Sequence, residues 1–235
     1  MTGNLGWLAL ASAFLLATHF GIASMGSRAA LAGRLGERGY RAVYSLISLV
    51  AIVWLCMAYG AAPAMPVWFA DTWMWFVPLA VTPLAFLLLA SGAGGAKPAA
   101  AVGQEKLLEQ ELGPRGVQRI TRNPVMWGIG LWAVAHMVPN GDWASLLFFG
   151  TFAVLALLGS VVIDAKHAVR RGDAWTRWTQ LSSNIPFVAL IQGRQNLGII
   201  IREIGWVRLA VALALYAGFL HGHTWLFGVS PLPPV

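Results

Sequence analysis

Two histidines that stand alone in long apolar stretches are the residues of this sequence best suited to chemistry. His19 follows the apolar run Phe14–Ala17, and His136 ends the run Trp132–Ala135. A buried imidazole needs a hydrogen bond or a metal ion, because an unpaired polar group is costly in an apolar medium. Neither histidine has another three or four residues away, so a zinc-type pair on one helix is excluded.

Two histidines on separate helices match the two axial positions of a haem iron, with the porphyrin held between helices of a bundle. Gly128 and Trp132 share the helix face of His136, where glycine would leave room for a flat macrocycle and the indole would pack on it. The sequence has no C-x-x-C-H motif, so the haem would be of the b type. The alternative is that both histidines bond only to hydroxyl or backbone groups.

The other three histidines are weaker candidates. His167 lies among Lys166, Arg170 and Arg171, where a solvated role is expected. His221 and His223 are two residues apart on one predicted helix and point about 200° apart, so they cannot share a site. His221 is the reserve ligand, because it lies closer to the expected depth of His136.

Basic and aromatic residues at the ends of the predicted spans are candidates for binding haem propionates. Arg122 is the first choice, because it precedes the span of His136 and a guanidinium binds a carboxylate through two hydrogen bonds. Arg28, Tyr40 and Tyr44 are the alternatives. Contact with lipid phosphate is the competing interpretation for these residues.

The composition predicts an integral membrane protein. Of 235 residues, 58% are hydrophobic and 11% are charged, whereas soluble domains carry about 25% charged residues. Cys56 is the only cysteine, which excludes a disulfide-stapled scaffold. The net charge of +7 arises from clusters at 28–41, 97–122 and 166–208, and no motif indicates nucleic-acid binding.

Six segments approach the roughly 20 apolar residues that cross a bilayer. They are Leu5–Met25, Ala42–Ala61, Thr72–Ser91, Pro124–Val138, Trp143–Ile163 and Gly205–Phe227. Lysine and arginine accumulate on the cytoplasmic side, so the alternation of basic and uncharged connections places both termini outside. We therefore predict a single all-α transmembrane domain over residues 1–235, surrounded by lipid and, in a bacterium, located in the inner membrane.

Several motifs together resemble the NnrU family of bacterial membrane proteins, which is similar to the plant zeta-carotene isomerases. The resemblance covers nearly the whole chain, and its most specific parts are His19–Ser24, Leu35–Arg38, Tyr44–Ser48, Arg119–Gly128, Leu131–His136 and Leu226–Pro233.

This resemblance implies a haem b protein with ligands at His19 and His136. In the isomerase branch it implies cis–trans isomerisation of a carotenoid double bond, whereas the name NnrU is linked to nitrite and nitric oxide reduction. Two positions depart from the pattern: Asn123 replaces the histidine of R-H-P, and Ala133 replaces a cysteine of the plant enzymes, so no thiolate ligand is available.

Two other functions compete with this interpretation. Arg122-Asn123-Pro124 followed by Gly128 is similar to the R-x-P-x-x-x-G start of the S-adenosylmethionine site in membrane methyltransferases. The downstream stretch Trp175–Phe187 has no carboxylate, although those enzymes need an acidic segment there. The third possibility is a non-catalytic assembly subunit with a membrane-protein partner. A haem-dependent isomerase would instead take a hydrophobic small-molecule substrate.

Overall fold

The computed structural model describes residues 4–93 and 113–233. Every secondary-structure element that we name in these residues is a helix. In chain order these are α1 (Leu5–Ala17), the π-helix η1 (Thr18–Ile22), α2 (Met25–Ala61), α3 (Thr72–Ala93), the 3-10 helix η2 (Gly116–Arg119), α5 (Pro124–Met137), α6 (Trp143–Arg171), α7 (Asp173–Leu181), α8 (Val188–Ile191) and α9 (Leu197–Phe227). Within the described residues no strand is present, so the prediction of an all-α fold is confirmed.

The predicted spans coincide with helices because the local start signals are in place. Side-chain oxygens of Asn4, Asp142 and Asn196 accept hydrogen bonds from backbone N–H groups three residues later, which satisfies donors that the first helical turn leaves unpaired. Pro124 opens α5, at a position where its missing N–H costs nothing.

Four helical segments are long and apolar enough to cross a membrane, which makes this a membrane protein with several spans. They are Leu5–Ile22, Met25–Ala61, Thr72–Gly92 and Trp143–Arg171. The other two predicted spans lie in α5 and α9, which are not among these four, and α5 has 14 residues. Six crossings with both termini outside stay a prediction.

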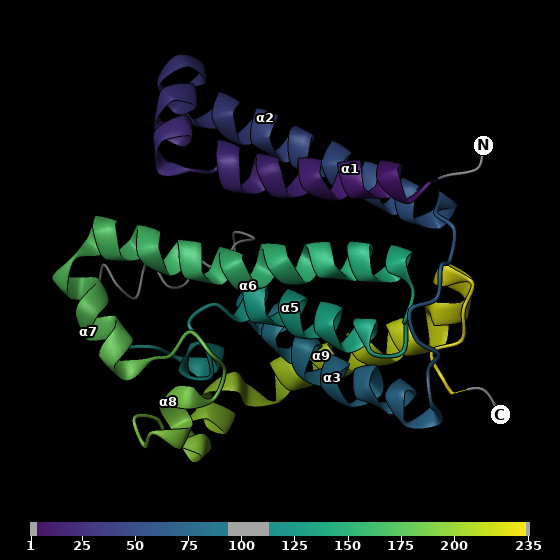
Figure 1. Ribbon diagram of the computed structural model, residues 1–235. Coiled ribbons are helices and arrows are strands. Elements are labelled where there is room, and N and C mark those ends of the chain that lie inside the picture. The colour runs from purple at the N-terminus through teal and green to yellow at the C-terminus, as the bar shows by residue number, and fades with distance from the viewer. Residues whose placement is uncertain (1–3, 94–112, 234–235) are drawn as a thin grey trace.

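The long helix α6 lies between two groups of helices (Figure 1). The hairpin of α1 and α2 lies on one side of α6, α5 lies on the other, and α3 and α9 follow beyond α5. Leu8, Leu15 and Leu55 are fully buried between α1, α2 and α6. Both termini lie at one end of the bundle, and the turn between η1 and α2 lies at the opposite end together with α7.

Two glycines bend the longest helices. Gly36 in α2 has φ 71° and ψ 163°, and Gly205 in α9 has φ 71° and ψ 162°. Only glycine adopts this region readily, and a Cβ at either position would meet no atom within 4 Å. Backbone conformation, rather than packing, therefore requires these glycines. The bend at Gly36 separates segment 25–35, which carries Arg28 and Arg34, from the rest of α2, and the bend at Gly205 separates segment 197–204 from the rest of α9.

Candidate functional site

His19 lies in the π-helix η1 with its ring held in a defined orientation. Nδ1 is 3.0 Å from the carbonyl oxygen of Leu15, and the ring meets Tyr44 edge-on with centroids 5.7 Å apart. With Nδ1 donating to this carbonyl, Nε2 carries the lone pair that binds a metal. The ring is half-buried, which leaves His19 suited to ligand binding.

Three of the predicted site residues form a chain of contacts that leads from His19 through Tyr44 and Tyr40 to Arg28. Tyr44 stacks on Tyr40, with ring centroids 6.0 Å apart, and the Arg28 guanidinium lies 5.7 Å from the centre of the Tyr40 ring. Arg28 also donates to both carboxylate oxygens of Glu37, at 3.1 and 3.0 Å. We refer to His19, Arg28, Glu37, Tyr40 and Tyr44 as the His19 cluster. It joins η1 to α2 on both sides of the bend at Gly36.

His136 is held in the same way in another part of the molecule. Its Nδ1 is 2.8 Å from the carbonyl oxygen of Trp132. The ring packs on Trp132 and on Phe149 of α6, with centroid distances of 5.2 and 5.3 Å. His136 therefore also presents Nε2 as a potential ligand, but in an aromatic pocket between α5 and α6.

The structure does not bring His19 and His136 to a common iron within one chain. The helix α6 packs against both α1 and α5, and the amino end of α1 lies at the same end of the bundle as the carboxyl end of α5 (Figure 1). His136 is the next-to-last residue of α5, whereas His19 lies fifteen residues beyond Asn4. At about 1.5 Å per residue, this separates the two depths by roughly 20 Å.

Gly128 and Trp132 do not form the predicted macrocycle site. A Cβ on Gly128 would lie 2.8 Å from Leu89 Cγ and 3.0 Å from the Ala85 carbonyl oxygen of α3. The glycine thus permits close contact between α5 and α3 rather than leaving room for haem. The ring of Trp132 packs edge-on against Phe149 and Phe152 of α6, at centroid distances of 5.3 and 5.7 Å. These two rings occupy the space next to the indole.

The remaining histidines differ from one another in setting. His221 is exposed on α9. Nδ1 of His223 is 2.9 Å from the Val229 carbonyl oxygen. His167 is 9% exposed and stacks on Trp175 at 4.7 Å, so the prediction of a solvated His167 is wrong. The reason is that α7 folds back over the end of α6.

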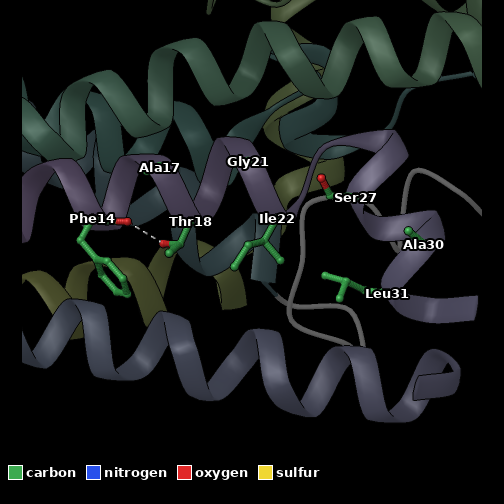
Figure 2. Close-up of a pocket in the computed structure, with 8 residues that line it drawn as sticks. All are labelled: Phe14, Ala17, Thr18, Gly21, Ile22, Ser27, Ala30 and Leu31. Atoms are coloured by element: carbon green, nitrogen blue, oxygen red, sulfur yellow. Dashed lines mark hydrogen bonds between the residues drawn. The ribbon is translucent and has the colours of Figure 1, made fainter. Parts of the chain in front are cut away.

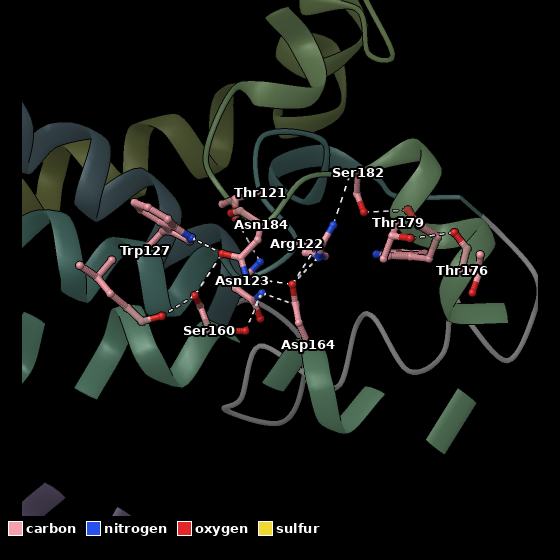
Figure 3. A network of polar contacts seen from close by, with 12 residues as sticks. Thr121, Arg122, Asn123, Trp127, Ser160, Asp164, Thr176, Thr179, Ser182 and Asn184 are labelled. Carbon is pink, nitrogen blue, oxygen red and sulfur yellow. Dashed lines mark hydrogen bonds and ion pairs between the residues drawn. The ribbon is translucent and has the colours of Figure 1, made fainter. Parts of the chain in front are cut away.

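Arg122 is engaged in a buried polar network rather than free to bind a carboxylate ligand (Figure 3). Its Nε and Nη2 each lie 2.7 Å from Oδ2 of Asp164 in α6, and Nη1 donates to the Ser182 carbonyl oxygen at 3.3 Å. Both charged side chains are 15% exposed. The first-choice propionate partner is thus already paired within the protein.

Two amide side chains also donate hydrogen bonds to the carboxylate of Asp164. Nδ2 of Asn123 and Nδ2 of Asn184 each donate to it at 2.8 Å. Asn184 Oδ1 in turn accepts from Trp127 Nε1 at 2.9 Å and from Ser160 Oγ at 3.0 Å. We refer to Arg122, Asp164 and these hydrogen-bonding partners as the Arg122 network. It ties α5, α6 and the 182–184 loop together.

Sequence reasoning missed Asp164 and Asn184. An acidic residue at the end of an apolar span requires a partner, which was the available signal for Asp164. Its partners lie 20 to 42 positions away in the chain. Because sequence patterns report on neighbouring residues, they do not predict contacts over this separation.

A second ion pair joins η2 to α9. Glu203 accepts from Arg119 Nε at 2.8 Å and Nη2 at 2.9 Å, and from the Gly116 backbone N–H at 2.6 Å. The hydrogen bonds from Arg119 lower the pKa of Glu203 below its usual value. This pair fixes the first segment of α9, before the bend at Gly205.

An open apolar groove of about 560 Å³ lies between the end of α1 with η1 and the first segment of α2 (Figure 2). Thr18 and Gly21, on either side of His19 in the chain, form part of its wall, and Ala30 and Leu31 of α2 form another part. The full lining is Phe14, Ala17, Thr18, Gly21, Ile22, Ser27, Ala30 and Leu31. Its volume lies in the range of small-molecule sites, about 300–1,000 Å³.

The fold and the apolar helices define an integral membrane protein of the all-α class. The family model described as NnrU protein matches residues 7–231, and the chain therefore belongs to the NnrU family. The chain is also similar to the maize (Zea mays) protein named 15-cis-zeta-carotene isomerase, chloroplastic, with 33% identity over 82 residues. That match covers 35% of this chain and 22% of the maize protein. Comparison with solved structures gives no match.

Proposed function

We propose that this protein binds haem b through His19 and isomerises a double bond of an apolar polyene in the bacterial inner membrane. The observation that carries the proposal is the His19 cluster, in which the oriented His19 imidazole contacts Tyr44, Tyr44 stacks on Tyr40, and the Arg28 cation lies over Tyr40. Thr18 and Gly21, which flank His19 in the chain, line an apolar groove. The similarity to a maize isomerase supports the reaction class.

The side chains around His19 fit a haem with a single ligand from this chain. His19 would supply the iron ligand through Nε2, and Arg28 would exchange Glu37 for a propionate at little cost, because that ion pair is exposed. The pairing of His19 with His136 on one iron does not fit the arrangement of one chain. Bound haem would supply an iron centre for electron exchange with a conjugated chain.

The residues of the chain would position the substrate and exclude water from it. Leu15 O orients the His19 ring, Tyr44 packs against the edge of that ring, and the groove walls surround the apolar chain. Isomerisation rotates one double bond and leaves no net oxidation or reduction. The protein therefore needs no external electron donor to complete a turnover.

The proposal is tested on the full-length protein purified in detergent from haem-supplied cells. We expect about one haem b per chain, assayed as the pyridine complex, and conversion of a cis polyene to its trans isomer by chromatography. A colourless preparation that stays inactive after haem is added would contradict the proposal.

The methyltransferase alternative receives no support from the residues that suggested it. Arg122 and Asn123 bond to Asp164, and Gly128 contacts α3. A role in nitrite or nitric oxide reduction, or as an assembly subunit with a protein partner, stays a prediction.

A further inference from the structure

We infer that Lys166, near the end of α6, is a positioning residue for His19. Its ammonium group holds the carbonyl oxygen of Ala23, the residue directly after the π-helix η1 that carries His19. That the imidazole held in this way binds haem iron rests on the proposed function, whereas the contact between Lys166 and the end of η1 does not.

The end of η1 leaves backbone carbonyl groups that need partners. The last carbonyl oxygens of a helix have no N–H group of the same helix to accept from, and η1 ends at Ile22. Two side chains supply the donors: Tyr40 Oη donates to Ile22 O at 3.5 Å, and Lys166 Nζ donates to Ala23 O at 2.6 Å. A hydrogen bond from a charged donor is about twice as strong as a neutral one. Lys166 therefore provides the stronger of these two contacts.

Lys166 brings this contact from the helix at the centre of the bundle. Asp164, two residues earlier on α6, binds Arg122 in the network that holds α5. Residues two positions apart on a helix point about 200° apart, so the two side chains reach opposite neighbours of α6. The end of α6 thus holds η1 on one side and α5 on the other, in agreement with its place between two groups of helices (Figure 1).

A second polar contact joins the α1–α2 hairpin to α6 at the opposite end. Tyr59 Oη of α2 and Ser145 Oγ, in the first turn of α6, are 2.9 Å apart. Apolar side chains fill the space between these helices, but apolar packing is non-directional. The contacts of Lys166 and Ser145 therefore set how far along α6 the hairpin, and η1 with it, is placed.

The placement of η1 determines where the His19 imidazole lies. His19 is the second residue of η1, and its Nδ1 is 3.0 Å from the Leu15 carbonyl oxygen on the preceding turn. A metal ligand has to be held within about 0.5 Å and 10–20° of its productive geometry. A π-helix is rare and occurs mostly as a single turn, so the local backbone gives His19 little support. The contact from α6 supplies that support.

The chemistry of Lys166 agrees with a positioning role. Among the residues that the structure describes, Lys166 forms no ion pair, and its ammonium donates to a neutral backbone carbonyl instead. A bond of this kind fixes one point of the backbone rather than neutralising a charge.

The test compares variants of the full-length protein in detergent. Lys166→Met keeps most of the side-chain length and removes the donor, whereas Lys166→Arg retains a charged donor. Arg170→Met is the matched control, because it removes a positive charge from an exposed position one turn later on the same helix. Lys166→Gln takes the place of Lys166→Met if that variant does not fold.

Hydrogen–deuterium exchange without haem measures how firmly η1 is held. We expect amide exchange in residues 18–24 to rise about tenfold in Lys166→Met, because a hydrogen bond from a charged group is lost, and exchange in residues 5–15 to stay unchanged. In the same samples diethyl pyrocarbonate should modify His19 faster relative to the exposed His221. Lys166→Arg and Arg170→Met should behave like the wild type. Unchanged exchange of residues 18–24 in Lys166→Met would overturn the inference.

Haem-loaded samples of the same variants separate the positioning of His19 from a purely structural role. We expect Lys166→Met to shift the Soret maximum and the reduction potential, because the imidazole meets the iron in a different orientation, and Lys166→Arg to restore both. Faster exchange of η1 with unchanged His19 reactivity, Soret maximum and potential would show that Lys166 only stabilises the fold, which would also overturn the inference. Wild-type protein without haem would contradict the proposed function, while exchange and His19 reactivity would still decide the role of Lys166.

Discussion

The His19 cluster and the Arg122 network are built from similar residue types but differ in how completely they are paired. In the network, Arg122 and Asp164 are each 15% exposed, and Asp164 accepts from three side chains. In the cluster, Arg28 and Glu37 are 33% and 55% exposed and bond mainly to each other. A largely buried ion pair with several hydrogen-bonding partners holds helices together, whereas an exposed and weakly held one is available to a ligand.

Removing Asp164 should have the largest effect on stability. Asp164→Ala leaves the Arg122 guanidinium and two amide groups buried without their acceptor, and loss of one partner from a buried ion pair costs about 3–5 kcal/mol. Thermal unfolding of the purified variant in detergent measures this change. A loss below about 1 kcal/mol, the range of exposed pairs, would show that the network does not hold α5 and α6 together.

Placing a side chain on the glycine at the bend, Gly36, should have the next largest effect on stability. Gly36→Ala places a Cβ on a residue with φ 71°, which costs about 1–3 kcal/mol. Gly33→Ala is the control, because Gly33 lies in the same segment without a positive φ and has no atom within 4 Å of its Cβ position. Equal unfolding temperatures for the two variants would mean that position 36 does not require glycine.

The ion pair of Glu203 predicts a smaller, pH-dependent effect. Its pKa is lowered in the folded protein by the hydrogen bonds from Arg119, so its contribution is present above the unfolded-state pKa and is lost as pH falls through the folded-state value. The difference in unfolding temperature between wild type and Glu203→Gln should therefore be largest near neutral pH and shrink below pH 4.5. A difference that is constant with pH would contradict this.

Breaking the exposed pair of the His19 cluster should change stability least. Glu37→Ala removes the carboxylate that Arg28 and Arg41 share, and exposed pairs contribute about 0–1 kcal/mol. Thermal unfolding in parallel with Asp164→Ala compares the two regions directly. A loss as large as that of Asp164→Ala would remove the distinction between them.

The sequence predicts the positions of the helices well, but it does not predict which helices and side chains contact one another. Runs of apolar residues with capping signals at Asn4 and Asp142 locate the spans, because both signals are local. The sequence does not reveal that the basic segment 25–35 continues into the span that follows it. The non-helical conformation of Gly36 interrupts the helix at that point and turns the chain between its two helical parts.

The candidate site was predicted only in part, because only the contacts between neighbours in the chain follow from local sequence. Arg28, Tyr44 and His19 come together because η1 and α2 are neighbours in the chain. The setting of Arg122 and Gly128 depends on Asp164 and on α3, whose positions follow from tertiary packing. The expected pairing of His19 with His136 fails within one chain because their depths along the bundle differ by roughly 20 Å. The relative depth of α1 and α5 follows from how each packs against α6, which local periodicity does not set.

The central claim is that the His19 cluster is the cofactor site. The most direct test is the haem content and absorption spectrum of purified His19→Ala beside His223→Ala, each expressed with the same haem supply. We expect loss of the Soret band in His19→Ala and an unchanged haem-to-protein ratio in His223→Ala, with both variants folded by circular dichroism. Full haem occupancy and an unaltered spectrum in His19→Ala would contradict it.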